Sequence, residues 1–470
     1  MFQSYQESRK ALLNGDTSAV AITQHFISEI KAKSDLNAFL EVFEESALSR
    51  AKEIDADISK GEIKSLTGMV IGLKDNICYK NHKVGAASKI LEGFESLYSA
   101  TVTEKLLEQG AIIIGRLNCD EFAMGSSNEN SAYGVVKNAL NTSKVPGGSS
   151  GGSATAVAGG LCHVTLGSDT GGSIRQPASF TGTVGLKPTY GRVSRHGLLA
   201  YASSFDQIGP FTQNVEDAAL VLEVISGKDE YDTTASSQEK ENYSELKLKK
   251  SAYKIAVIEE CLTSEGINPE AKSNFNALIE QLKNAGHEIE LVSFHYLDCM
   301  VPAYYVLTTA EASSNLSRYD GVHYGHQSDK AQGVEEIYKM SRSEGFGPEV
   351  KRRIMAGTFV LSNEYYDAYY TQAQKVRRVL QNKTNDIFNN FDFVLTPTTP
   401  DVAFDLDSVK DPITMYLQDI FTVHANLTGN PAISIPKGKS SDDLPFGIQL
   451  MANHFEEAEM LAFSQEIEKL

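Results

Sequence analysis

The sequence predicts an α/β protein built on a large mixed β-sheet with helices on both faces. Short apolar runs typical of buried strands alternate with amphipathic, helix-like segments along most of the chain, a pattern characteristic of this class. The chain has 470 residues, of which 41% are hydrophobic, so it can bury a sizeable core and is not disordered.

The first expected elements are helices. In residues 17–33 and 44–60, apolar side chains recur every three or four positions among charged ones, which is the periodicity of an amphipathic helix. Residues 1–60 are therefore expected to form an N-terminal helical layer. The same periodicity predicts helices at 215–225, 269–285, 362–388 and 455–470, and a helix of small residues at 153–158.

Seven short apolar runs are expected to form the strands of the sheet. They lie at 69–73, 111–114, 162–166, 254–258, 393–395, 432–435 and 446–451. Residues 228–250 are charged and rich in Ser and Thr, which indicates a surface loop. Because strand-like runs continue on both sides of this loop, the sequence favours a single domain over residues 1–470.

The charge balance and the lack of long apolar runs exclude several classes of protein. With 43 Lys and Arg against 61 Asp and Glu, the formal charge is −18, which disfavours nucleic-acid binding through a basic surface of its own. No apolar run is long enough to span a membrane, and the N-terminal segment lacks the apolar core of a signal peptide. Five scattered cysteines without a CxxC pair indicate reduced thiols. A soluble cytoplasmic protein is expected.

The most unusual segment is residues 146–173, in which 9 of 28 residues are Gly. Two loops rich in Gly and Ser flank a predicted helix and a predicted strand, an order that brings both loops to the same edge of the sheet. Open α/β sheets bind their ligands at that edge, so the active site is expected there. The glycines indicate close approach of backbones or positive φ angles.

The known nucleotide-binding and serine-hydrolase motifs do not fit these Gly-rich loops. A nucleotide-binding loop needs Gly-Lys-Ser/Thr, and a dinucleotide fold needs GxGxxG after a strand; neither is present. Gly147, Ser149 and Gly151 match the GxSxG of serine hydrolases, but no strand is predicted before them, so the match is interpreted as accidental.

A serine nucleophile also needs a base. The 10 histidines offer no distinctive spacing, which leaves a lysine as a candidate base, as in Ser-Lys hydrolases. Lys74 directly follows the apolar run 69–73. To act as a base, its pKa must fall from about 10.4 towards 7, which requires burial.

Three motifs together resemble the amidase signature family. They are LKDNI at 73–77, PGGSSGGSA at 146–154 and GSDTGGSIRQPA at 167–178. The resemblance implies the amidase signature fold, with a Lys–Ser–Ser triad of Lys74, Ser149 after a cis peptide bond, and the nucleophile Ser173. The backbone N–H groups of Thr170, Gly171, Gly172 and Ser173 are expected to form the oxyanion hole. Asp169 and Arg175 are expected to brace this turn rather than react.

Within that family, residues 121–134, 185–198, 344–354 and 411–422 resemble the glutaminase subunits of tRNA-dependent amidotransferases. The resemblance implies hydrolysis of glutamine to supply ammonia, with no cofactor in this chain. The expected partners are a B subunit, which would bind ATP and Mg and carry most contacts to Glu-tRNA(Gln), and a small C subunit; no membrane is involved.

Free glutamine carries two charges that such an enzyme must recognise. By resemblance, Asp419 is expected to bind the α-amino group and Arg353 the α-carboxylate, with Tyr304 nearby. The adjacent Arg352 and Tyr305 leave each of these two choices open.

Three alternatives stay open at this point. The nearest is an amidase of the same family that acts alone on a small amide. The others are a His-dependent serine esterase and an inactive scaffold whose Gly-rich loops bind phosphate.

Overall fold

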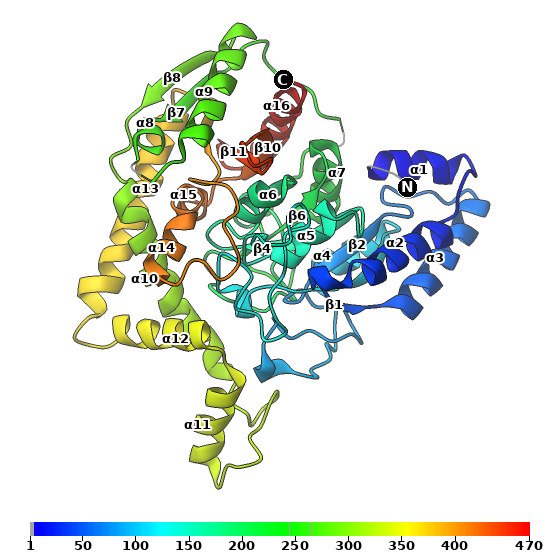
Figure 1. Cartoon of the computed structure of the whole chain (residues 1–470), viewed down its shortest axis with the longest axis vertical. Helices are drawn as coiled ribbons and strands as arrows, with labels where there is room; N and C mark the ends of the chain where they lie inside the picture. The colour runs from blue at the N-terminus through cyan, green and yellow to red at the C-terminus, as the bar shows by residue number, and fades with distance from the viewer. Residues whose placement is uncertain (1–3, 244, 265) are drawn as a thin grey trace.

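The computed structural model describes residues 4–243, 245–264 and 266–470, and in these residues eleven strands form one mixed sheet (Figure 1). The strand order is β1-β3-β2-β4-β6-β5-β10-β11-β9-β7-β8. The strands are β1 Phe39–Val42, β2 Val70–Lys74, β3 Ile112–Leu117, β4 Val164–Asp169, β5 Val184–Lys187, β6 Gln207–Thr212, β7 Lys254–Ile258, β8 Glu288–Val292, β9 Phe393–Pro397, β10 Ala432–Lys439 and β11 Pro445–Ala452. The predicted α/β class with a large mixed sheet is confirmed.

Parallel pairing of β2 with both β3 and β4 positions the site. Ile71 pairs with Val164 and Leu73 with Leu166, so β2 and β4 run side by side in the same direction. The carboxyl ends of the two strands, at Lys74 and Asp169, therefore lie at the same edge of the sheet, as expected for the loops that follow them. Farther along the sheet, each successive pair in the order β4-β6-β5-β10-β11-β9 is antiparallel.

Helices cover both faces of the sheet (Figure 1). One face packs against α2, α3, α5, α6, α10, α13 and α15, and the other against α4, α7, α9 and α16. The helices are α1 Tyr5–Leu13, α2 Ala19–Ala32, α3 Glu44–Ser59, α4 Thr101–Glu108, α5 Gly151–Ala158, α6 Arg175–Thr181, α7 Val215–Ile225, α8 Glu259–Thr263, α9 Pro269–Asn284, α10 Leu297–Asn315, α11 Val334–Gly345, α12 Pro348–Val360, α13 Gln372–Phe388, α14 Pro412–Tyr416, α15 Val423–Thr428 and α16 Glu457–Lys469. None of the helices in the described ranges has both the length and the apolarity to cross a membrane.

The helix boundaries follow local sequence signals. The Ser18 side chain accepts a hydrogen bond from the Ala21 N–H at the start of α2, and the Asn214 side chain caps α7 in the same way. At the start of α9, Pro269 occupies the first turn after the Asn268 cap. These caps occur where the apolar periodicity begins, which is why the helices at 215–225 and 269–285 were predictable within one residue.

The structure corrects the sequence prediction in three places. The expected helix 362–388 begins instead at Gln372, after a π-helical stretch, Tyr366–Thr371. The small-residue helix begins at Gly151, two residues earlier than expected. Strands β1, β5, β6 and β8 were missed because they lack long apolar runs; β6 even contains Pro210, which pairs with Leu166 in the middle of the sheet.

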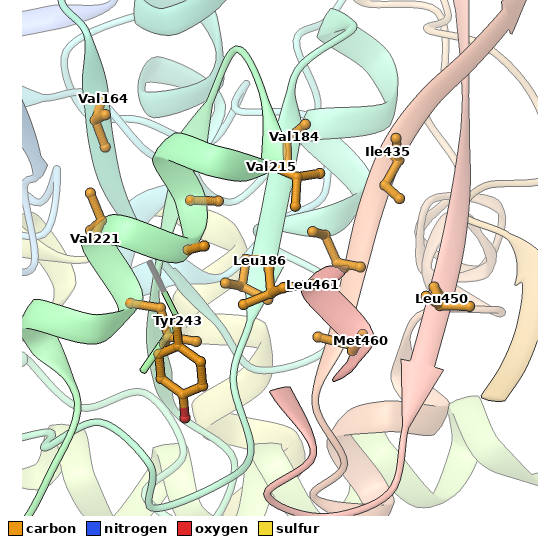
Figure 2. Packing of buried hydrophobic residues seen from close by; sticks show 14 of the residues in the cluster. Val164, Val184, Leu186, Val215, Val221, Tyr243, Ile435, Leu450, Met460 and Leu461 are labelled. Atoms are coloured by element: carbon orange, nitrogen blue, oxygen red, sulfur yellow. The ribbon is translucent and has the colours of Figure 1, made fainter. Parts of the chain in front are cut away.

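Residues 228–250 contain no helix or strand among the positions described. Part of the segment nevertheless packs on the core: the Tyr243 side chain is fully buried in the cluster that includes Leu186 of β5, Val221 of α7 and Leu461 of α16 (Figure 2). Arg192 also donates hydrogen bonds to the carbonyl oxygens of Gln238 and Glu239. The segment is therefore attached to the body of the protein by both apolar and polar contacts.

This packing predicts that Tyr243→Ala will lower the free energy of unfolding by about 3–5 kcal/mol, because it leaves a cavity in the core. Tyr231→Ala is the matched control, since Tyr231 lies in the same segment but is 78% exposed; its effect should stay within about 0.5 kcal/mol. Denaturant unfolding measures both. Equal, small effects would show that the segment contributes nothing to the core.

Candidate active site

Lys74, the last residue of β2, lies at the centre of the candidate site. Its side chain is fully buried, and its Nζ lies 2.7 Å from Ser149 Oγ, 2.8 Å from Ser150 Oγ and 3.0 Å from Ser168 Oγ. Burial lowers the pKa of Lys74 to about 8, although Cys119 and the carboxylates of Asp120, Asp169 and Asp206 oppose the shift. At pH 7 roughly a tenth of this amine is therefore neutral, far more than for an ordinary lysine, and only the neutral form can act as a general base.

Ser149 lies in the loop between residue 145 and α5, and the peptide bond before it, Gly148–Ser149, is cis. The loop is fixed by one buried side chain and one backbone hydrogen bond. The Gly148 N–H donates to Gln176 Oε1 at 3.0 Å, and the Asp120 N–H donates to the Ser149 carbonyl at 3.0 Å. A Cβ at position 148 would lie 2.1 Å from Asp120 Oδ2, so only Gly fits there.

Ser173 lies in the turn between β4 and α6. Its side chain is 7% exposed and makes no hydrogen bond within the described part of the chain. The preceding Gly172 has a φ of 137°, and a Cβ on it would lie 2.1 Å from Thr422 Oγ1. Because Ser168 reaches Lys74 and Gln176 reaches Gly148, the turn that carries Ser173 is held against the Ser149 loop.

Asp169 and Arg175 brace this turn, as predicted. Asp169 Oδ1 accepts from the Gly172 N–H at 2.8 Å and Oδ2 from the Ile174 N–H at 3.1 Å. Arg175, fully buried, donates to both carboxylate oxygens of Asp169. Burial acts to raise the pKa of Asp169, but the Arg175 guanidinium outweighs it and the pKa is lowered, so the carboxylate stays ionised.

The predicted oxyanion donors are not equivalent in the structure. The Gly172 N–H is unavailable because it already donates to Asp169. Among the described residues, the backbone N–H groups of Thr170, Gly171 and Ser173 donate to no protein acceptor. Three unused donors on one tight turn beside Ser173 provide a place where a developing negative charge can be stabilised.

Thr422 links Asp419 to this turn by two hydrogen bonds. Thr422 Oγ1 donates to the carbonyl oxygens of Gly171, at 2.7 Å, and of Asp419, at 3.1 Å. Asp419 Oδ2 accepts from Ser126 Oγ at 2.7 Å, whereas its Oδ1 is buried and has no partner in the described residues. Burial raises the pKa of Asp419 to about 7, although the Ser126 hydroxyl opposes the shift. The free oxygen fits a cationic ligand.

Arg353 and Arg352 differ sharply in their surroundings. Arg353 is 3% exposed, donates to Glu349 Oε1 at 2.8 Å and to the Tyr201 hydroxyl at 2.9 Å, and stacks on Tyr305 with 5.1 Å between guanidinium and ring centroid. The Arg352 side chain is 52% exposed and pairs only with Glu349. Both line a cavity of about 300 Å³, but only Arg353 is rigidly held.

The adjacent Tyr304 and Tyr305 also have different contacts. The Tyr304 hydroxyl lies 3.0 Å from Thr170 Oγ1, and a Cβ on Gly171 would lie 2.6 Å from Tyr304 Cζ. Tyr304 therefore covers the predicted oxyanion turn. Tyr305 instead packs between Arg353 and Tyr416. The geometry thus places Tyr304 beside the reacting groups and Tyr305 beside the predicted carboxylate ligand.

No histidine joins this site. None of the ten in the described chain hydrogen-bonds to Ser149 or Ser173; His163 Nδ1, for example, accepts from the Val70 N–H at the opposite end of β2. The same residues contain no group of three His, Cys, Asp or Glu side chains placed to hold a metal ion. A His-dependent esterase is therefore unsupported by the geometry.

Several residues that shape the site were not predicted from the sequence. Ser150 and Ser168 contact Lys74, Gln176 links Gly148 to the Ser126 carbonyl, and Ser126 contacts Asp419. All four lie within the motifs already noted, but serines and glutamines are common in loops. Only their spatial partners distinguish them.

Comparisons with known proteins agree with this geometry. The family model described as "Amidase" matches residues 21–461. The A subunit of glutamyl-tRNA(Gln) amidotransferase from Koribacter versatilis is 50% identical over 98% of this chain and 97% of its own length. The crystal structure of the corresponding protein from Thermotoga maritima superposes with a TM-score of 0.80 at 40% identity, covering 96% of this chain and 91% of the other. The native peptide amidase of Stenotrophomonas maltophilia superposes with a TM-score of 0.83 at 26% identity, covering 99% and 96%.

The lowered pKa of Lys74 predicts a pH-dependent cost to folding. Because the folded value is about 8 and the ordinary value 10.5, the unfolded chain binds more protons between those values, so stability rises with pH across that window. Relative to Lys74→Met, which lacks this group, the wild type should gain about 3 kcal/mol of unfolding free energy as pH rises from 8 to 10.5.

Urea unfolding of both proteins at several pH values measures this difference. Other titrating groups, including the buried Lys187, are present in both proteins and cancel in the comparison. A difference that does not change with pH would mean that Lys74 keeps an ordinary pKa in the folded protein.

Proposed function

The chain belongs to the amidase family, and from this premise we propose that it is the glutamine-hydrolysing subunit of a glutamyl-tRNA(Gln) amidotransferase. The observation that carries the proposal is the buried Lys74 amine, 2.7 Å from Ser149 and beside a turn with three unused N–H donors. The named relatives, at 50% identity over nearly the full chain, support this assignment within the family.

The chemistry proposed is acyl transfer through Ser173. Ser173 Oγ attacks the side-chain carbonyl carbon of glutamine while its proton passes to Ser149 Oγ, and the Ser149 proton passes to the neutral Lys74 amine. The carbonyl oxygen becomes an oxyanion held by the free N–H groups of Thr170, Gly171 and Ser173. Lys74 is then an ammonium ion.

Collapse of this intermediate releases ammonia. The proton held on Lys74 returns through Ser149 to the departing nitrogen, the carbon–nitrogen bond breaks, and a glutamyl ester remains on Ser173. Water then attacks the ester by the same relay, which frees glutamate and restores the Ser173 hydroxyl. No net charge builds up in the pocket, because each proton taken by Lys74 is returned.

Glutamine selection is proposed to rest on the two buried charged groups. Asp419 Oδ1 lacks a partner and would accept from the α-ammonium group, while Arg353 would donate to the α-carboxylate. Tyr304, above Gly171, would close the pocket over the carboxamide. Arg353 is preferred to Arg352 because its burial and its fixed Glu349 and Tyr201 partners hold it in one orientation.

The ammonia is proposed to be used by a second protein of the same complex. The relatives are named as one subunit of an amidotransferase, which implies a multi-subunit complex. We place ATP and Mg on a B subunit that also contacts Glu-tRNA(Gln), with a C subunit joining the two. The acidic chain suits this division, since RNA binding is left to the partner. All five cysteines in the described residues are free, which fits the reducing cytoplasm.

If Ser173 is the nucleophile, Ser173→Ala will abolish glutamine hydrolysis by the assembled complex, lowering kcat by roughly 10⁴-fold or more. Ser179→Ala is the control, because Ser179 lies in the helix that follows and its hydroxyl contacts only Thr399 and the Gly447 N–H. Released ammonia is the readout. Retained hydrolysis in Ser173→Ala would rule out the assignment.

If Asp419 binds the α-ammonium group, Asp419→Asn will raise the KM for glutamine roughly 10- to 100-fold, because a charge-assisted hydrogen bond is lost. Since burial raises the pKa of Asp419 to about 7, the wild-type KM should also rise as pH falls below that value. Asp419→Asn should lack this pH dependence.

A simple primary amide without an α-amino group provides the comparison substrate. Its hydrolysis should be nearly unaffected by Asp419→Asn. Equal losses for both amides would remove Asp419 from substrate binding and favour a stand-alone amidase that acts on a small amide.

A further inference from the structure

Lys74 Nζ is surrounded by more hydroxyl groups than the proton relay uses. Ser149, Ser150 and Ser168 all lie within 3.0 Å of it. A lysine ammonium has three N–H donors, so it can bond to all three oxygens. The neutral amine has only two N–H groups and one lone pair, so one of the three hydroxyls must donate to it instead. The hydroxyl that donates is therefore the one that the lone pair of the Lys74 amine faces.

Ser150 has another acceptor for its proton. A hydroxyl carries one proton, and Ser150 Oγ donates it to the Ser168 carbonyl oxygen at 3.1 Å. Ser150 therefore accepts an N–H from Lys74 in both protonation states. Its side chain is fully buried at the start of α5, and a Cβ on Gly167 would lie 2.9 Å from Ser150 Oγ, which shows how closely the strand backbone confines it.

Ser149 and Ser168 also differ. Ser168 Oγ accepts from Asn76 Nδ2 at 2.9 Å, so a second group besides Lys74 fixes its position. Ser149 Oγ lies closest to Lys74, at 2.7 Å, and has no other partner in the described residues. The shorter contact, and the absence of a second partner such as Asn76, favour Ser149 over Ser168 as the hydroxyl that donates to the neutral amine.

We propose that Ser150, assisted by Ser168, is a positioning residue that holds the two N–H groups of neutral Lys74 and so directs its lone pair at Ser149. The inference rests on the amide hydrolysis proposed above and adds the reason that the neutral amine accepts its proton from Ser149 and not from another of the three hydroxyls. Without these acceptors the amine can rotate about its last bond, and its lone pair spends part of the time turned away from the Ser149 proton.

The test compares Ser150→Ala with Ser153→Ala in the assembled complex, with glutamine as substrate. Ser153 is the matched control: it lies in the first turn of α5, directly after Ser150, is fully buried, and donates to a β4 carbonyl, that of Leu166, at 3.2 Å. Within the described residues it makes no hydrogen bond to Lys74. Both variants therefore lose a similar buried hydrogen bond, and only one loses the contact with the base.

Ser150→Ala should lower kcat at least tenfold and shift the acidic limb of the pH profile of kcat/KM to lower pH by about one unit, because the ammonium form loses an acceptor. Ser153→Ala should leave the limb in place and kcat within about twofold. An unchanged limb in Ser150→Ala, or equal losses in both variants, would show that Ser150 acts through packing alone. A shift to higher pH would indicate a loosened, hydrated pocket and also overturn the proposal.

Ser168→Ala removes the second acceptor of the Lys74 N–H groups, and it should also shift the acidic limb of the kcat/KM profile to lower pH. The proposal therefore stays testable if Ser150→Ala fails to fold. A wild-type complex that hydrolyses a simple primary amide but not glutamine would contradict the proposed function alone. The Ser150 comparison would then be made with the simple amide.

Discussion

The buried amine of Lys74 is the constraint on which the rest of the site depends. A lysine at the end of a central strand, without contact with water, costs folding free energy unless its N–H groups are satisfied. Three serine hydroxyls, supplied by the α5 loop and by β4, provide those partners. The same burial lowers the pKa of Lys74. One arrangement therefore both stabilises the side chain and makes it a usable base without a histidine.

A second buried charged group holds the turn that carries Ser173. Arg175 reaches Asp169 on one side, and the Thr422 carbonyl and Asn426 on the other. Asp169 in turn accepts the Gly172 and Ile174 N–H groups. Because its two oxygens are used by Arg175 and by the backbone, Asp169 organises the turn and leaves the neighbouring N–H groups unused. The Gly172 N–H, which belonged to the predicted oxyanion hole, is occupied by this bracing.

Short polar contacts link the turn that carries Ser173 to Asp419, the proposed ligand of the α-ammonium group. Thr422 bonds to Gly171 and to the Asp419 carbonyl, and Gln176 joins Gly148 to the Ser126 carbonyl. Ser126 then bonds to the Asp419 carboxylate. Residues that are far apart in the chain are thus held at fixed separations, as differential binding of a small zwitterionic substrate demands. The buried Oδ1 of Asp419 is the group that this arrangement leaves without a partner.

The sequence by itself determined the α/β class, most of the strands with apolar runs, the capped helices, and the Gly-rich loops that contain Ser149 and Ser173. These features depend on local periodicity, capping and backbone sterics, which a sequence states directly. The tertiary structure decided the rest. Strands β5 and β6 form because neighbouring strands pair with them; β5 has only four residues and β6 contains Pro210, so their sequences do not indicate strands. The burial of Arg353 beside the exposed Arg352, the use of the Gly172 N–H by Asp169, and the contacts of Ser150 and Gln176 depend on which groups meet across distant segments. Burial and hydrogen-bond partners are properties of the packed chain, so no local pattern could have revealed them.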